Sequence, residues 1–149
     1  MLSRKYRMAM LLTLMGCLPF AAVAQQSANA AGPGMINIAG LSSTYAACLK
    51  SANEKVLAVD ACMSSELKNQ DARLNKIYKS LLDTLQPNAK NALVEAERVW
   101  VQLKSKDQSF ETALYGDTQV ANAQQVENDL YRVTARANAL EKYLKFAQL

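Results

Sequence analysis

Two acidic residues in different segments have the types and positions that could support catalysis. Asp71, Asn75 and Tyr78 stand at positions i, i+4 and i+7, a spacing that places them on one face of a helix. Asp107 lies inside the apolar stripe of a later helical pattern. A pair of carboxylates between helices would suggest general acid–base chemistry.

The alternative is a buried polar network that fixes how the helices pack. A carboxylate on a core-facing stripe needs a partner, because burying it unpaired costs several kcal/mol. The candidate partners are Lys104, Arg73, Arg132 and Arg136. We favour this structural interpretation, since no Gly-rich loop, nucleophile elbow or metal-ligand spacing accompanies the carboxylates. The predicted network consists of Asp71, Asn75, Tyr78, Lys104 and Asp107.

The chain contains no histidine. This excludes Ser-His-Asp and Cys-His catalysis and removes the commonest metal ligand. Trp100 lies on an apolar stripe, where we favour a core position over a sugar-stacking platform. We therefore expect no catalytic residue, no metal and no cofactor.

The first 24 residues have the layout of a secretory signal peptide. Basic residues precede an uncharged apolar run from Met8 to Leu18, and Ala22-Val23-Ala24 forms a cleavage signature before Gln25. An uncleaved anchor is the alternative, but the uncharged stretch is shorter than the roughly 20 residues that a bilayer requires. A lipoprotein modified at Cys17 is a further alternative. We favour cleavage after Ala24, periplasmic or secreted localisation, and no stable membrane insertion afterwards.

The exported form is close to electrically neutral. Three of the 17 basic residues and none of the 13 acidic ones precede Gln25, which leaves a net charge of +1. Basic and acidic residues alternate along the rest of the chain, as on a solvated helical surface. No clustered basic face points to a nucleic-acid partner.

The remaining sequence predicts an all-α domain over residues 41–149, after a flexible leader over residues 25–40. Apolar residues recur at gaps of three, four or seven in three long segments, and short connections favour antiparallel neighbours. A short helix precedes them and ends at Ala52, and Asn53 is expected to cap the next helix. Pro87 separates the first two long helices, and Gly116-Asp117 with a capping Thr118 separates the last two. The predicted core stripes are Met63, Leu67, Leu74, Tyr78, Leu81 and Leu85; Leu93, Ala96, Trp100, Leu103, Phe110 and Leu114; and Val126, Leu130, Val133, Ala137, Leu140 and Leu144.

Cys48 and Cys62 remain after signal cleavage. In an oxidising compartment a disulfide is the simplest interpretation, and it would tether the short helix to the first long one. The alternative, a reactive thiol, would require a basic or histidine neighbour.

The segment from Cys48 to Leu144 resembles the LprI-type lysozyme-inhibitor domain, a family of small exported or lipid-anchored bacterial proteins. Its pattern of D-x-x-L-N-x-x-Y matches residues 71–78, and an A-x-R-x-W stretch matches residues 96–100. Asp107, the Phe110-Glu111 pair, and Arg136 with Leu140 follow in the family's order.

The chain departs from this pattern where the family has a second cysteine pair. Gln108 occupies the first of these positions, and the second falls near Asn128 or Asp129. Both cysteines are absent together, as expected if a whole disulfide was replaced. Lys104 stands where the family usually has arginine. Lysine does not replace arginine fully in a bidentate contact with a carboxylate.

The resemblance implies a non-enzymatic periplasmic binding protein that inhibits lysozyme or another cell-wall-cleaving enzyme. A structural or assembly factor of the cell envelope, with no enzyme target, is the alternative. A protein partner is expected in either case. For an inhibitor we expect the contact at loops and helix ends, with Tyr115 and Asp117 as the candidate residues.

Overall fold

The computed structural model describes residues 38–149. The predicted signal peptide, its cleavage site, the alternative lipid site at Cys17 and most of the predicted leader lie outside these residues. Four helices and no strand occupy the described part of the chain: α1 (Ser43–Ala52), α2 (Val56–Thr84), α3 (Pro87–Tyr115) and α4 (Gln119–Ala147). The all-helical class predicted from the sequence is confirmed. None of the helices in this part is long and apolar enough to cross a bilayer.

The helix limits follow from local capping residues. Ser42 caps α1 by accepting a hydrogen bond from the Tyr45 amide at 3.0 Å, and Thr118 caps α4 in the same way through the Ala121 amide at 3.1 Å. Pro87 is the first residue of α3, where its missing amide hydrogen costs nothing. Gly116 ends α3 with a φ of 77°, a conformation that glycine adopts without a steric penalty.

One capping prediction is wrong. Asn53 does not begin α2 but ends α1 in the left-handed conformation, and Glu54 also has a positive φ. These two residues reverse the chain, so Lys55 precedes the first turn of α2. Asparagine tolerates the left-handed region better than most residues, which explains its place at the end of a helix.

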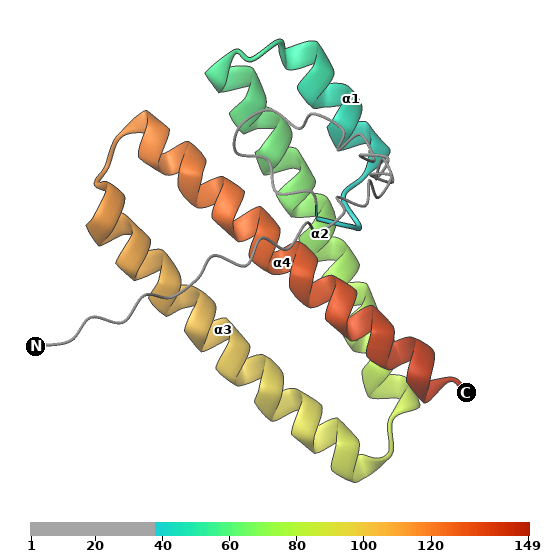
Figure 1. The fold of residues 1–149 in the computed structure, drawn as a ribbon. Coiled ribbons are helices and arrows are strands. Elements are labelled where there is room, and N and C mark those ends of the chain that lie inside the picture. The colour runs from blue at the N-terminus through green and yellow to red at the C-terminus, as the bar shows by residue number, and fades with distance from the viewer. Residues whose placement is uncertain (1–37) are drawn as a thin grey trace, which may run out of the picture. The chain divides into compact units, whose positions relative to one another are not determined.

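Helices α2 and α4 form the main packing pair, and α3 lies alongside α4 with a smaller contact (Figure 1). Figure 1 shows α3 running opposite to α2 and α4, which run in the same direction. One apolar cluster joins these three helices through Leu74, Ile77, Leu81, Leu93, Val133, Ala137 and Leu140. A second cluster fastens α1 to α2 and α4 through Tyr45, Ala52, Cys62, Met63 and Leu130.

The core stripe predicted for α3 is largely wrong. Leu93 is buried and Trp100 is half-buried, but Leu103, Phe110 and Leu114 are 57%, 64% and 59% exposed. The face of α3 turned towards α4 instead carries polar groups, which are described below. Helix α3 is therefore the edge helix of this domain and leaves an apolar flank in solvent.

Candidate functional site

The residues of the D-x-x-L-N-x-x-Y motif line a groove between α2 and α3. Asp71, Asn75 and Tyr78 of α2 face Trp100 and Lys104 of α3 across a volume of about 520 Å³. Asn75 is exposed and Tyr78 is half-buried against the core cluster, whereas Leu74 of the motif is buried in that cluster. The motif therefore contributes one core residue and a set of accessible polar groups.

Asp107 lines a different cavity. A volume of about 350 Å³ between α3 and α4 is lined by Asp107 together with Arg132 and Arg136. Trp100 and Lys104 border both cavities and separate them. The two carboxylates considered for acid–base chemistry thus do not share a cleft.

Within residues 38–149, Asp71, Lys104 and Asp107 make no side-chain hydrogen bond or ion pair with one another. The one contact inside the predicted network runs from the Asn75 amide nitrogen to the Asp71 backbone oxygen at 2.9 Å. This is a local bond within one helical turn. Among the described residues, no group of three or more His, Cys, Asp or Glu side chains could hold a metal ion.

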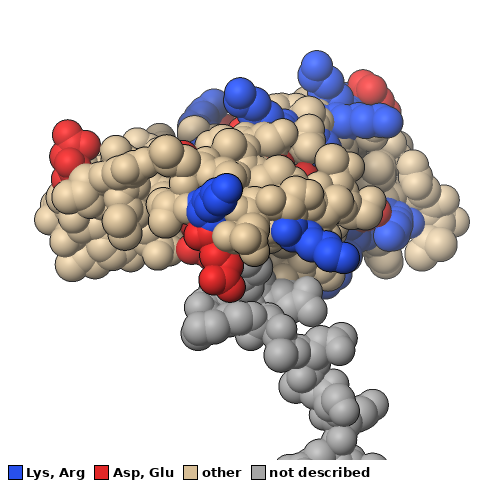
Figure 2. Space-filling view, turned by 90° about the horizontal axis from the view of Figure 1, so that it is seen from above, with Lys and Arg blue, Asp and Glu red and all other residues tan. Residues whose placement is uncertain are grey.

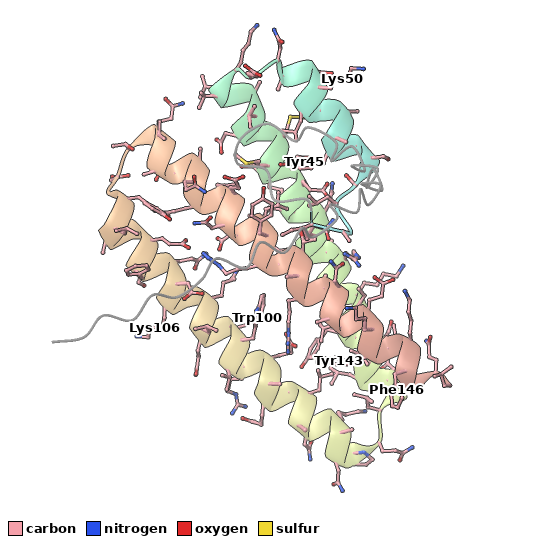
Figure 3. The ribbon with its side chains drawn as sticks, viewed as in Figure 1. Tyr45, Lys50, Trp100, Lys106, Tyr143 and Phe146 are labelled. Atoms are coloured by element: carbon pink, nitrogen blue, oxygen red, sulfur yellow. A yellow bond between two sulfur atoms is a disulfide. The ribbon has the colours of Figure 1, made fainter. Side chains whose placement is uncertain are left out.

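Two of the three arginines predicted as partners, Arg132 and Arg136, instead bind glutamates on the inner face of α3, and the third, Arg73, pairs with Glu141 of α4. Arg132 donates two hydrogen bonds to Glu111 Oε1, at 3.0 and 2.5 Å. Arg136 donates to Glu97 Oε1 through Nε at 2.8 Å and through a second guanidinium nitrogen. The Arg136 guanidinium also lies 6.0 Å from the centroid of the Trp100 ring. Figure 3 shows Trp100 between the two helices.

The geometry of these pairs explains how α3 is held. Arg132 and Arg136 are one helical turn apart on α4, whereas Glu97 and Glu111 are 14 positions apart on α3. The two arginines therefore reach in opposite directions along α3, and the cavity beside Asp107 lies between them. Burial disfavours the charge on Arg132, but the hydrogen bonds and charge of Glu111, with Asp129 and Asp107 adding to them, raise its pKa above the ordinary value.

Sequence reasoning missed these pairs, although a signal for them exists. Residues 93, 97, 100, 104, 107 and 111 recur at gaps of three or four. This series includes both glutamates and describes the face that packs on α4. The more apolar series through Leu103 and Phe110 describes the exposed flank.

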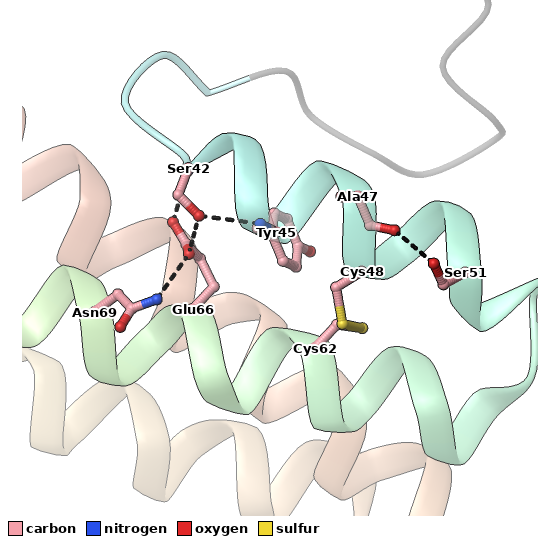
Figure 4. The surroundings of a disulfide bond; sticks show 8 residues. All are labelled: Ser42, Tyr45, Ala47, Cys48, Ser51, Cys62, Glu66 and Asn69. Carbon is pink, nitrogen blue, oxygen red and sulfur yellow. Dashed lines mark hydrogen bonds between the residues drawn. A yellow bond between two sulfur atoms is a disulfide. The ribbon is translucent and has the colours of Figure 1, made fainter.

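A second polar cluster anchors the segment that leads into α1 (Figure 4). The buried Glu66 carboxylate accepts hydrogen bonds from the Ser42 amide at 2.8 Å, the Ser42 hydroxyl at 2.6 Å and the Gln70 amide group at 2.8 Å. A fourth, longer bond comes from Asn69 at 3.3 Å. Burial alone would raise the pKa of the Glu66 carboxyl, but these hydrogen bonds together lower it below the ordinary value.

The chain just before this cluster is held by α2 and α4. Gln70 donates to the Gly40 carbonyl at 2.8 Å, and Asn138 donates to the Ala39 carbonyl at 2.5 Å. Gly40 has a φ of 101°, and a Cβ at this position would lie 2.5 Å from Asn138 Oδ1. Glycine is therefore required there by both conformation and space.

Cys48 and Cys62 form a disulfide beside the Glu66 cluster, with their Cα atoms 5.8 Å apart. The predicted tether between α1 and α2 is thus confirmed. The bridge and the carboxylate cluster fix the same short helix at two neighbouring points of α2.

The connection between α3 and α4 is open to solvent, and every residue from 112 to 120 is exposed. Tyr115 is 40% exposed, Asp117 is exposed, and the position of Gly116 has no atom within 4 Å of a hypothetical Cβ. Leu114 and Val120, 59% and 72% exposed, flank this turn. Figure 2 shows that this end of the domain, at the left, is mostly uncharged. An aromatic ring, two aliphatic side chains and one carboxylate thus project from a single turn.

The described residues define a small all-α domain with a tethered N-terminal helix, a set of accessible motif residues and one exposed apolar turn. Residues 48–143 match the family described as Lysozyme inhibitor LprI, which is well over half of the chain. The protein therefore belongs to the LprI lysozyme-inhibitor family. Searches of curated proteins and of solved structures returned no significant match.

Proposed function

We propose that this protein is a non-enzymatic inhibitor of lysozyme, or of another cell-wall-cleaving enzyme, that acts in the periplasm or after secretion. The observation that carries the proposal is the exposed turn between α3 and α4 in a chain of this family. The predicted signal peptide, cleaved after Ala24, would deliver the protein without a lipid anchor to the compartment where such enzymes act.

The contact is assigned to Tyr115 and Asp117. Exposed apolar side chains gathered at one place mark surfaces that bind partners, and Leu114 and Val120 supply them beside Tyr115. Aromatic residues are over-represented among the groups that dominate binding energy. A protruding aromatic and polar turn suits a cleft built for a sugar chain, because such clefts combine apolar walls with a few polar groups.

The separation of Asp71 from Asp107 supports a role without catalysis. A general acid and a general base must both reach one reacting centre, whereas these two carboxylates line different cavities. The lack of histidine in the chain removes the commonest proton-transfer group.

The test is a cell-wall lysis assay with a common-type lysozyme and the purified exported form, at low and at physiological salt. Inhibition is expected, and Tyr115→Ala combined with Asp117→Ala should abolish it while helicity and melting temperature stay unchanged. Tyr143→Ala combined with Asp83→Ala is the matched control, since both residues are exposed and lie on other parts of the domain. Absence of inhibition at about 50 µM protein, where even a weak micromolar complex would form, would exclude this lysozyme as the target.

That outcome would favour the second candidate function, a structural or assembly factor of the cell envelope. The observation behind this alternative is the apolar flank of α3, on which Val99, Leu103 and Phe110 are all more than half exposed. An exposed apolar flank of this kind is typical of a protein that binds a stable partner. Capture with the exported form from periplasmic extract and from host secretions would distinguish the two candidates by the partner recovered.

A further inference from the structure

The outer flank of α3 carries a regular apolar stripe that is exposed to solvent in the single chain. Its members recur at alternating gaps of four and three residues, which is the spacing of a coiled-coil seam. Five of them are Ala92, Ala96, Val99, Leu103 and Phe110, and all are exposed. Lys106 occupies the one polar position of the series, between Leu103 and Phe110. Figure 3 shows Lys106 on the side of α3 that faces away from α4, opposite to Trp100.

We infer that this stripe is the interface of a two-fold symmetric dimer, in which α3 packs antiparallel against α3 of a second copy. The most common protein oligomers have this symmetry, and it requires a surface that is complementary to itself. The stripe meets this requirement in both size and charge.

Size complementarity selects one register. With Val99 opposite Leu103 of the second copy, the antiparallel arrangement sets Phe110 opposite Ala92, so the largest side chain meets one of the smallest. A shift of one heptad in one direction sets Lys106 against Leu103. A shift in the other direction carries Phe110 past Pro87, where α3 begins, and leaves it without a partner. Only the first register buries every apolar member of the series.

Charge complementarity selects the same register. Lys106 then lies opposite Ala96 of the second copy and next to Glu95 of that copy, and the symmetry repeats this pair on the other side. Within one chain, Glu95 contacts Arg98 at 3.1 Å. Both side chains of that contact are about 60% exposed, and such pairs bind weakly, so Glu95 is available to the second copy.

This dimer leaves the turn at Tyr115 free. In the chosen register Tyr115 lies opposite Pro87, where α3 begins in the second copy, so only residues beyond Tyr115 extend past that start and the two turns lie at opposite ends of the paired helices. The inference is therefore independent of the proposed function, and its failure would not touch the assignment of Tyr115 and Asp117.

The test is sedimentation equilibrium of the exported form together with single variants. The unmodified chain should be dimeric, and Leu103→Glu should be monomeric with unchanged helicity, because Leu103 is 57% exposed in the single chain. Val120→Glu is the control, since Val120 is 72% exposed and lies outside the stripe; this variant should stay dimeric. A monomer at about 100 µM, the weak end of specific association, would overturn the proposal.

Two further measurements test the register. Lys106→Glu should weaken the dimer by about tenfold, through loss of two ion pairs and gain of like-charge contacts, and adding Glu95→Lys should restore it. Chains with Val99→Cys mixed with chains with Leu103→Cys should cross-link to each other more efficiently than either alone. Failure of the charge reversal to restore the dimer, or preferential cross-linking of identical variants, would overturn this arrangement.

Discussion

Gln108 on α3 donates a hydrogen bond to Asp129 on α4, with Nε2 and Oδ2 2.5 Å apart. Gln108 stands at the first position of the family's absent second cysteine pair, and Asp129 is one of the two residues, with Asn128, near which the sequence resemblance places the second. The two helices are thus joined at the same point by a polar contact in place of a covalent one. This contact lies one turn from the ion pair of Glu111 with Arg132, and the two contacts together attach the C-terminal half of α3 to α4.

Restoring the cysteines should therefore restore a disulfide. Gln108→Cys combined with Asp129→Cys should oxidise without perturbing the helices. It should raise the free energy of unfolding by roughly 3 kcal/mol, the entropy term for a loop of about 20 residues. Intact mass before and after reduction and denaturant unfolding in both states provide the measurement.

Gln108→Cys combined with Asn128→Cys is the matched control, since Asn128 is the neighbouring residue and makes no contact with Gln108. Equal oxidation of both double variants would show that α3 and α4 slide or rotate against each other and would contradict the geometry described above.

The native bridge between Cys48 and Cys62 closes a loop of 14 positions. Replacing both cysteines by serine should lower the free energy of unfolding by roughly 2–4 kcal/mol. Helicity should persist, because α2, α3 and α4 share a core that does not include α1. Circular dichroism and denaturant titration measure the two quantities, and complete alkylation of the unreduced protein would disprove the bridge itself.

All helix limits except the boundary between α1 and α2, and two of the three core stripes, could be predicted from the sequence. Thr118 and Pro87 are local signals whose effect does not depend on the rest of the fold. The stripes of α2 and α4 carry large aliphatic residues at a regular spacing, and Leu81, Leu130 and Leu140 are fully buried as predicted.

The orientation of α3 could not be predicted in this way. Hydrophobicity alone favours the face with Leu103 and Phe110, whereas the face that packs on α4 includes Glu97 and Glu111. Those glutamates are tolerated in the interface because Arg136 and Arg132 supply opposite charges from another helix. That compensation is a tertiary contact between residues 21 and 39 positions apart, and a reading of local periodicity does not include it.

The Asp107 side chain should contribute little to the free energy of unfolding. Although the sequence suggested a buried ion pair, Asp107 is only partly buried and no cation lies within ion-pair distance among residues 38–149. Asp107→Ala should thus lower the free energy of unfolding by less than about 1 kcal/mol, because it removes only a longer-range attraction to Arg132 and no direct ion pair. Thermal unfolding is the measurement, with Glu111→Ala as the paired comparison. A loss of several kcal/mol on Asp107→Ala would restore the original interpretation.

Glu66 should make the attachment of α1 dependent on pH. Its pKa is lowered in the folded protein, so its contribution to stability is fully present above the unfolded pKa of about 4.3. That contribution is lost as the pH falls through the lower folded value. Glu66→Gln should therefore destabilise the protein at neutral pH by roughly 1–3 kcal/mol.

The difference between Glu66→Gln and the unmodified protein should shrink as the pH falls below about 4. Denaturant unfolding over this pH range measures it, and Glu54→Gln, at an exposed position, is the control. A difference that stays constant down to pH 2 would contradict the role assigned to the Glu66 carboxylate.

The pair of Arg136 and Glu97 gives the last prediction, because it holds the middle of α3 against α4. The two side chains are 18% and 12% exposed. Removing one partner would leave the other charge buried and unpaired, so Glu97→Ala should lower the free energy of unfolding by roughly 3–5 kcal/mol. Replacing both by apolar residues, Glu97→Leu with Arg136→Met, should cost much less, since neither charge then remains unpaired.

Hydrogen exchange locates the effect of Glu97→Ala. Amides of α3 should lose protection in this variant, while α2 and the disulfide-tethered α1 keep theirs, because those helices are anchored without α3. Uniform loss of protection across all four helices would mean that α3 unfolds only together with the rest of the domain, and the description of α3 as an edge helix held by two arginines would then be wrong.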